Sequence, residues 1–236
     1  MVGHPGGGRP AHQLPSGRHG IPHDLVLSNQ RGRLLKALME VVMRNGYASM
    51  RVADVIAIAG VSRRTFYDNF ANKQDAFLAA YDAVVRQLME TVGAQFATGD
   101  AWPDKVARAL TAFLTSMASG PAVARVCIVE VLAAGPSALE RRATTMSSFR
   151  QFIVPDAAEV PAAPLVSELT IETIIGGLYE VVYARVIAGR TDELPLLVPD
   201  LLRTILLPFV GAEAAALECA RVARSHAAAP LPPVGG

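Results

Sequence analysis

Residues 46–78 constrain the fold most strongly, because they describe two short helices joined by a tight turn. The first helix, over residues 51–58, is amphipathic because its apolar residues recur at helical spacing: Val52, Val55, Ile56 and Ala59. Gly60 then supplies the left-handed conformation that a sharp reversal requires. Ser62 is a suitable N-cap for a second helix over residues 62–70, because its hydroxyl can accept a bond from an unpaired backbone N–H.

The second short helix carries polar side chains that indicate a charged partner. Arg63 and Arg64 fall in its first turn, where cations are unfavourable because a helix N-terminus is already partly positive. A phosphate or a base edge in front of them reverses that argument. Phe66 and Phe70, spaced i, i+4, are predicted to face the core. The outward residues are common donors to DNA phosphates, and arginine is the commonest reader of guanine: Thr65, Tyr67, Asn69 and Lys73. Two arginines alone are more often a solvated face, but the combined pattern predicts a helix that enters the DNA major groove.

Residues 34–78 resemble the DNA-binding domain of TetR-family transcriptional repressors. The matching residues keep one register over about 45 residues: Ala37, Val41, Val42, Gly46, Tyr47, Asp54, Ala59, Gly60, Val61, Ser62, Thr65, Phe66, Tyr67, Phe70, Lys73 and Phe77. The resemblance implies a helix-turn-helix repressor with an all-helical ligand-binding and dimerisation domain. It also implies that Ser62 to Asn69 lie in or over the major groove, while Thr65, Tyr67 and Lys73 hold phosphates.

Three places depart from that family pattern. Met50 and Arg51 stand where many members have Thr or Ser, Ile56 stands where many have a small residue, and Asn69 replaces a common histidine. Arg51 is a candidate to make the phosphate contact itself. The predicted DNA-binding residues are Arg51, Ser62, Arg63, Arg64, Thr65, Tyr67, Asn69 and Lys73.

Composition favours an all-α protein with a sizeable core, because 51% of the 236 residues are hydrophobic and no alternating strand pattern is present. The net charge of +1 hides an asymmetry. Residues 1–73 hold 10 Lys or Arg and 4 Asp or Glu, whereas residues 74–236 hold 12 and 17. A basic N-terminal third fits a DNA-binding domain joined to a body that must not adhere to DNA.

Four regions are predicted. Residues 1–27 form a flexible basic arm, 28–73 the helix-turn-helix domain, 74–226 the ligand-binding and dimerisation domain, and 227–236 a loose tail. The expected helices beyond the two short ones cover residues 28–45, 74–96, 104–118, 121–134, 136–152, 165–188, 195–210 and 212–225. The helix over 121–134 is expected to be central, and outward side chains are expected at Glu140, Arg141, Arg142 and Arg150.

The N-terminal arm is rich in Gly, Pro and His, but its histidines lack the spacing of a metal site, so no metal is predicted. A basic arm can instead reach a DNA minor groove. The candidates for that contact are Arg18, His19, Arg31 and Arg33.

The helix over 165–188 is apolar nearly all round, which indicates burial on two sides. Gly176 and Gly177 cost about 1 kcal/mol each relative to alanine in mid-helix, which favours a close approach of another helix. With the helix over 195–210, this helix is expected to form a four-helix homodimer interface, as the resemblance implies. The alternative is one larger monomeric core.

The second domain is also expected to bind an apolar small molecule. Periodicity does not separate a cavity wall from a packed core, so each candidate has a structural alternative. The candidate ligand-binding residues are Phe113, Met117, Arg125, Phe149, Phe152, Tyr179 and Tyr183.

An enzyme is not predicted, because the sequence has no Gly-rich phosphate loop, HExxH, GxSxG or clustered Cys and His. No cofactor is predicted, and Cys127 and Cys219, in apolar helical contexts, are interpreted as small core residues or unremarkable thiols. With no signal peptide and no long apolar run, we expect a cytoplasmic protein without a membrane segment. The expected function is a ligand-released repressor that binds a pseudo-palindromic double-stranded DNA operator as a dimer. The alternative is a DNA-binding regulator that responds to a protein partner.

Overall fold

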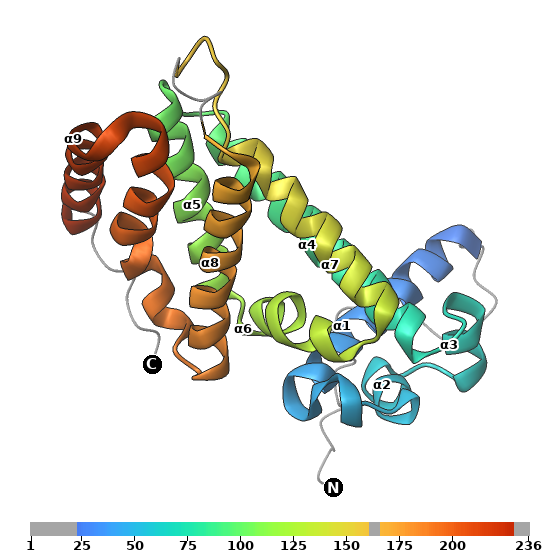
Figure 1. The fold of residues 1–236 in the computed structure, drawn as a ribbon. Coiled ribbons are helices and arrows are strands. Elements are labelled where there is room, and N and C mark those ends of the chain that lie inside the picture. The colour runs from blue at the N-terminus through green and yellow to red at the C-terminus, as the bar shows by residue number, and fades with distance from the viewer. Residues whose placement is uncertain (1–22, 161–165, 229–236) are drawn as a thin grey trace, which may run out of the picture.

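The computed structural model describes residues 23–160 and 166–228, and in these residues the chain is helical with no strand. The predicted all-α class is confirmed. Figure 1 shows α1–α3 at one end of the molecule and α5, α8 and α9 at the other, with α4 and α7 running between them. The elements are α1 (His23–Ser49), α2 (Val52–Ala59), α3 (Arg63–Asn69), α4 (Lys73–Phe96), α5 (Trp102–Ser119), α6 (Pro121–Ala124), η1 (Arg125–Val129), η2 (Glu130–Ala133), α7 (Pro136–Ser148), η3 (Phe149–Phe152), α8 (Glu168–Ile187), η5 (Thr191–Leu197) and α9 (Val198–Ala228).

The first core lies under α1, α2 and α3 and includes the start of α4. The apolar stripe of α1 is fully buried there, as its 3.6-residue period predicts. Gly46 has a φ of 73°, so the helix breaks at this glycine as predicted, although the helical assignment continues to Ser49. α1 begins at His23, before the expected start at Ser28. The rest of the predicted arm and the tail from 229 lie outside the described residues.

The second core is built around α5, which packs against α4, η5 and α9. Its largest buried side chain is Trp102, whose ring meets Phe209 at 5.1 Å between centroids. α4 belongs to both cores: Phe77 and Tyr81 are buried in the first, while Leu88 and Val92 are buried in the second. The long helix therefore joins the two ends of the molecule as one rigid element.

Residues 121–134 do not form the single central helix that the sequence predicts. A four-residue α6 is followed by a π-helical turn, η1, and then by a 3₁₀ turn, η2. Gly120 and Pro121 start the segment, and Gly135, with a φ of 94°, ends it. The segment is apolar, as expected, but its side chains divide between the two cores, and a straight helix would not supply both.

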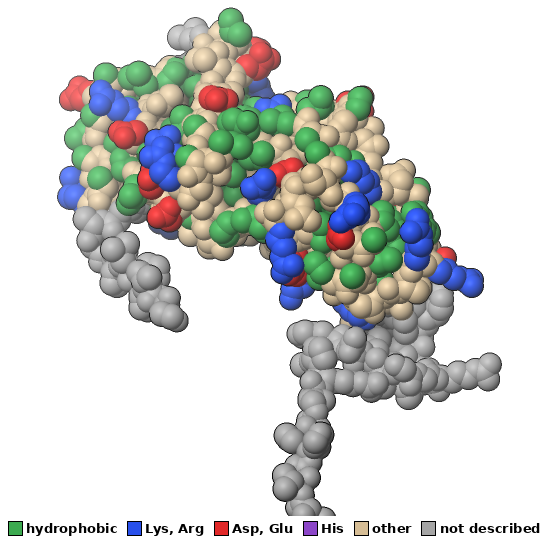
Figure 2. All heavy atoms as spheres, turned by 90° about the horizontal axis from the view of Figure 1, so that it is seen from below, with side chains coloured by type: hydrophobic (Ala, Val, Ile, Leu, Met, Phe, Trp, Pro, Cys, Tyr) green, Lys and Arg blue, Asp and Glu red, His purple; other side chains and the backbone are tan. Residues whose placement is uncertain are grey.

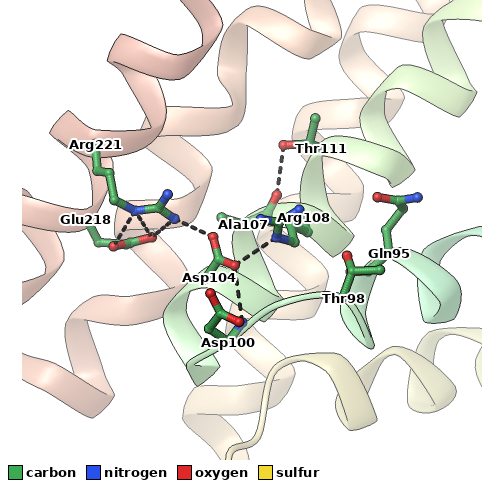
Figure 3. Close-up of polar contacts among 9 residues, drawn as sticks. All are labelled: Gln95, Thr98, Asp100, Asp104, Ala107, Arg108, Thr111, Glu218 and Arg221. Atoms are coloured by element: carbon green, nitrogen blue, oxygen red, sulfur yellow. Dashed lines mark hydrogen bonds and ion pairs between the residues drawn. The ribbon is translucent and has the colours of Figure 1, made fainter.

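The last helix was predicted as two, over 195–210 and 212–225, and it is kinked at Gly211, where φ is 80°. The part of α9 after the kink is tied to α5 by charged side chains (Figure 3). Arg221 donates to Asp104 at 2.5 Å and to Glu218, and Arg108 donates to the other oxygen of Asp104 at 2.7 Å. By length and apolar composition alone, Thr191–Arg224 is long enough to cross a membrane, and 39% of its most apolar window is buried inside the described chain.

Candidate nucleic-acid interface and apolar cavity

The turn between α2 and α3 has the geometry that the sequence predicts. Gly60 is left-handed, with φ 60° and ψ 43°, and its N–H bonds back to the end of α2. Ser62 caps α3: its hydroxyl accepts the N–H of Thr65 at 3.0 Å, and the two hydroxyls share a further bond of 2.9 Å. Phe66 and Phe70 are buried in the first core, as their spacing predicts. The turn therefore fixes the angle of α3 against α2.

The exposed side of α3 and the start of α2 carry the free basic groups. Arg64 is 90% exposed and only loosely paired with Asp68, at 3.8 Å. Arg63 lies over the ring of Tyr67, 5.5 Å from its centroid. Arg51 is 80% exposed and pairs with Asp54 at 3.3 Å. Figure 2 shows several Lys and Arg side chains over this end of the molecule, with fewer acidic ones between them. An anionic surface could meet these groups without disturbing the core.

Lys73 has different partners from the predicted phosphate. Its ammonium donates to the carbonyl oxygens of Tyr47 and Ala48, each at 3.2 Å, and of Met50 at 3.3 Å. It also lies 4.6 Å from the centre of the Tyr47 ring. Because an ammonium has three N–H donors, this geometry occupies all of them within the protein. In this geometry Lys73 caps the C-terminal segment of α1, and its contact with DNA stays a prediction.

Two other side chains predicted to contact DNA already form hydrogen bonds within the domain. The side-chain amide of Asn69 donates to the carbonyl of Thr65 at 2.8 Å, and the hydroxyl of Thr65 is bonded to Ser62. The sequence offers Arg31 and Arg33 as candidates for a minor-groove contact. Arg31 donates to the carbonyl of Asn69 at 3.1 Å, and Arg33 to that of Gly60 at 3.0 Å. These two arginines therefore hold the ends of α3 and α2 to α1. Arg18 and His19 lie outside the described residues.

A cavity opens in the second core between α4, α5, α7 and α8. It contains about 890 Å³ of space not filled by atoms, counted to its open mouth, and its walls are almost wholly apolar. Five predicted ligand residues line it: Phe113, Met117, Phe149, Phe152 and Tyr179. Three of their rings form a chain of edge contacts, with Phe149 5.3 Å from Phe113 and 6.2 Å from Phe152.

The polar groups of the cavity gather at one side. The guanidinium of Arg142 lies 4.0 Å from the centre of the Tyr179 ring, and its Nε is buried without a hydrogen-bond partner. The hydroxyl of Tyr179 donates to the carbonyl of Ile128 at 2.5 Å. Burial raises the pKa of Tyr179 above 10.0 and outweighs the lowering by Arg142, so this hydroxyl keeps its proton at neutral pH. Tyr81 donates to Thr145 at 3.1 Å, and burial raises its pKa to about 12.

Two predicted ligand residues lie outside the lining of the cavity, and one arginine expected on the surface lies within it. Arg125 does not line the cavity, because its Nε bonds Glu130 at 2.8 Å between the two cores. Tyr183 stacks on Tyr179, 6.4 Å between centroids, but stays outside the lining. Arg142 was expected to point outward and instead lines the cavity. The signal that could have found it is helical spacing, because Arg142, Thr145, Met146 and Phe149 form one stripe of α7.

Cys127 also lines the cavity, and it is a small buried core residue, one of the two interpretations that its apolar context allows. The side chain is buried, and burial raises the pKa of the thiol to about 12. A thiol that does not ionise near neutral pH is a poor nucleophile. Among the described residues, no group of three or more His, Cys, Asp or Glu side chains is placed to bind a metal.

Residues 34–80 match the model of the bacterial regulatory proteins of the tetR family. Over 67 residues the chain is 36% identical to the HTH-type transcriptional regulator CymR of Pseudomonas putida; the match covers 28% of this chain and 33% of that protein. The sequence match thus spans about a third of the length of that relative.

Solved structures extend the likeness over most of the chain. The fatty acid degradation regulator FadR from Bacillus halodurans has a TM-score of 0.68 at 18% identity, covering 75% of this chain and 94% of that one. FadR from Bacillus subtilis, solved in complex with stearoyl-CoA, has a TM-score of 0.64 at 20% identity, covering 76% and 98%. At these identities the structures show a shared fold. Residues 34–80 thus match the helix-turn-helix segment of the tetR family of bacterial regulatory proteins, and the fold of both cores is shared with the solved regulator structures.

Proposed function

We propose that this chain is a cytoplasmic repressor that binds a pseudo-palindromic operator as a homodimer and is released by an acyl ligand. The observation that carries the proposal is α3, a short helix capped by Ser62 whose exposed face presents Arg63 and Arg64. The rigid turn at Gly60 and the buried Phe66 fix this helix to the rest of the domain. A helix held in this way can enter a major groove without further folding.

The proposed DNA contacts follow from which side chains are exposed. Arg63 and Arg64 are assigned to base edges, because a guanidinium pairs with guanine through two bonds. Arg51 and Tyr67 are assigned to phosphates on either side of the groove. Ser62, Thr65 and Asn69 mainly shape the helix, because their side chains bond within it: the Ser62 hydroxyl to Thr65 and the Asn69 amide to the Thr65 carbonyl. This division makes the arginines the main readers of sequence.

The dimer is proposed to form through α8 and α9. At Gly176 and Gly177 no atom lies within 4 Å of where a Cβ would be, so the described chain gives no packing reason for these glycines. A second α8 could approach closely there. Large apolar side chains of α8, η5 and α9 are exposed: Leu169, Ile187, Leu196 and Leu207. If this dimer forms, it buries the apolar surface of the long C-terminal helix. No membrane is then needed to explain that surface.

The ligand is proposed to be an acyl chain with an anionic head. The walls of the cavity suit a hydrocarbon chain, and Arg142 supplies a cation beside them. The buried Nε of Arg142 without a partner would be satisfied by a carboxylate or phosphate oxygen. The FadR structure with stearoyl-CoA supports this ligand class, because its fold is shared.

Two measurements test the proposal together. Gel retardation with DNA from upstream of the chain's own coding sequence should show one specific complex, and light scattering should show a dimer. Stearoyl-CoA should raise the melting temperature of the free protein. It should also weaken the DNA complex about 5- to 150-fold, and the DNA should weaken stearoyl-CoA binding by the same factor. Failure to bind any upstream fragment would refute the repressor. DNA binding that ignores both stearoyl-CoA and stearate would favour a protein partner instead.

A further inference from the structure

Glu130 is the buried charged side chain of the described residues, and it lies between the two cores. One carboxylate oxygen accepts the backbone N–H of Tyr47 at 2.7 Å, and the other accepts Nε of Arg125 at 2.8 Å. The bond to Tyr47 joins residues 83 positions apart in the sequence. A buried carboxylate is costly unless it is paired and hydrogen-bonded, so this pair of bonds holds the carboxylate at the junction.

The donor of this bond, the N–H of Tyr47, lies in the segment that links α1 to α2. Tyr47 follows Gly46, whose φ of 73° favours glycine, and a Cβ on Gly46 would lie 3.2 Å from the Glu130 carboxylate. The same short segment offers three carbonyls to Lys73, the first residue of α4. The link from α1 to α2 is therefore held on its N–H side by Glu130 and on its carbonyl side by Lys73.

The other end of the segment that carries Glu130 forms part of the cavity wall. Cys127 and Ile128 line the cavity, and the carbonyl of Ile128 accepts the hydroxyl of Tyr179. Within the same few residues, Val126 and Val131 are buried in the first core. These residues form the π turn η1 and the 3₁₀ turn η2. Such turns have more than one accessible hydrogen-bonding pattern and are common at functional sites.

We propose that Glu130 transmits the state of the cavity to the DNA-reading domain, through the path Tyr179, Ile128 carbonyl, η1, Glu130 and the N–H of Tyr47. The proposal rests on the proposed ligand-released repressor and adds the residue that couples its two sites. A ligand that moves Tyr179 changes the bond on Ile128, and a change of pattern in η1 turns Glu130 relative to Tyr47. The α1–α2 link then loses one of its two supports. This supplies the two-state element that coupling between distant sites requires.

The first experiment needs no ligand. Amide hydrogen exchange at Tyr47 is measured in the full chain and in Tyr179→Phe, which removes the bond to Ile128. The matched control is Tyr183→Phe, which removes a hydroxyl from the neighbouring stacked ring on the same helix. Exchange at Tyr47 should rise at least about twofold in Tyr179→Phe and stay unchanged in the control. Equal exchange at Tyr47 in all three proteins would overturn the path.

The second experiment uses stearoyl-CoA as the probe and compares wild type with Glu130→Gln, which keeps an acceptor oxygen and so preserves folding. The factor by which stearoyl-CoA weakens operator binding should fall to about one in Glu130→Gln, although each partner alone still binds. Glu159→Gln, which breaks the surface pair with Lys105, is the control and should keep the wild-type factor. An unchanged factor in Glu130→Gln would exclude the role of Glu130. If stearoyl-CoA does not affect the wild type, the proposed effector fails, while the amide-exchange comparison still decides the path.

Discussion

Three backbone carbonyls converge on the ammonium of Lys73, so this residue acts within the fold of the reading domain. The position looks like a phosphate contact in the sequence, because a lysine follows the aromatic end of a basic helix. The carbonyls that accept its N–H groups come from residues 47–50. The sequence around Lys73 gives no sign that these residues lie beside it in the fold. Residue type alone therefore predicts a donor, whereas the fold selects its acceptor.

Replacing Lys73 by alanine is expected to destabilise the protein more than it weakens the electrostatic part of DNA binding. Loss of charge-assisted bonds to carbonyls should lower the free energy of unfolding by about 1.5–3 kcal/mol. The slope of log affinity against log salt should change by less than one unit, because no phosphate contact is lost. Urea denaturation and salt titrations of operator binding measure the two quantities. A full unit of slope lost without destabilisation would restore the phosphate assignment.

Arg63→Ala and Arg64→Ala are expected to weaken operator binding by about 1–3 kcal/mol each and to relax base preference. The reason is that both guanidiniums are exposed on the face of α3 and are not needed for its folding. Arg86→Ala, exposed on α4, is the charge-matched control and should bind as wild type does. Competition with operator variants reads out the preference. Unchanged preference in both α3 variants would show that other side chains read the sequence.

At the scale of elements, Asp104 joins the start of α5 to the last part of α9 (Figure 3). Burial raises the pKa of Asp104, but hydrogen bonds from Arg108 and Arg221 outweigh it and leave the pKa below 3.8. A carboxyl with a lowered pKa in the folded protein stabilises it above pH 3.8, and that contribution is lost as the pH falls through the folded value.

The melting temperature of the wild type should therefore fall more steeply below pH 4 than that of Asp104→Asn, which has no carboxyl to protonate. At pH 7 the variant should be the less stable of the two. Asp156→Asn, exposed in the loop after η3, is a control expected to follow the wild-type curve. Calorimetry between pH 3 and pH 7 measures the curves, and parallel curves for wild type and Asp104→Asn would contradict the assignment.

Gly177→Leu tests the role of the glycines in α8. Within the protomer there is open space at this position, and leucine is a better helix former than glycine by roughly 0.5–1 kcal/mol. The protomer should therefore fold at least as well, while the dimer should dissociate at higher protein concentration. Ala143→Leu, exposed on α7, is the size-matched control. Analytical ultracentrifugation measures the dissociation. If the Gly177→Leu variant stays dimeric at the same concentrations as the wild type, the dimer surface lies elsewhere.

Sequence periodicity located most helices to within a few residues, because each depends on its own apolar stripe and caps. It failed at residues 121–134, where the backbone is shaped by the bond between Glu130 and Tyr47 and by two cores at once. It also misplaced Arg142, because a charge within an apolar stripe was read as a surface residue. Helix caps and apolar stripes can be recognised in the local sequence, whereas contacts between distant segments cannot.

At the scale of the whole molecule, the two cores are continuous through α4 and through residues 121–138. Burial on both sides of η1 means that neither core can loosen there without affecting the other. Glu130, Arg125 and the Tyr47 N–H form a hydrogen-bonded group at this junction. The same continuity that permits coupling should make unfolding a single cooperative transition. Intrinsic fluorescence of Trp102, buried in the second core, and helical circular dichroism should therefore give one melting temperature.

The reading domain completes its own core with Val126, Val131, Ala134 and Ala138, which come from far along the chain. The N-terminal domain, α1–α3, is therefore not expected to fold stably without these residues. A fragment that stops after α4 would expose the apolar surface that these residues cover, and a chimera that transplants α1–α3 onto another body would inherit the same gap. Exchange of operator specificity between relatives is thus expected to proceed by substitutions on the exposed face of α3. A chimera that joins α1–α3 of one protein to the second core of another would also have to transfer residues 121–138.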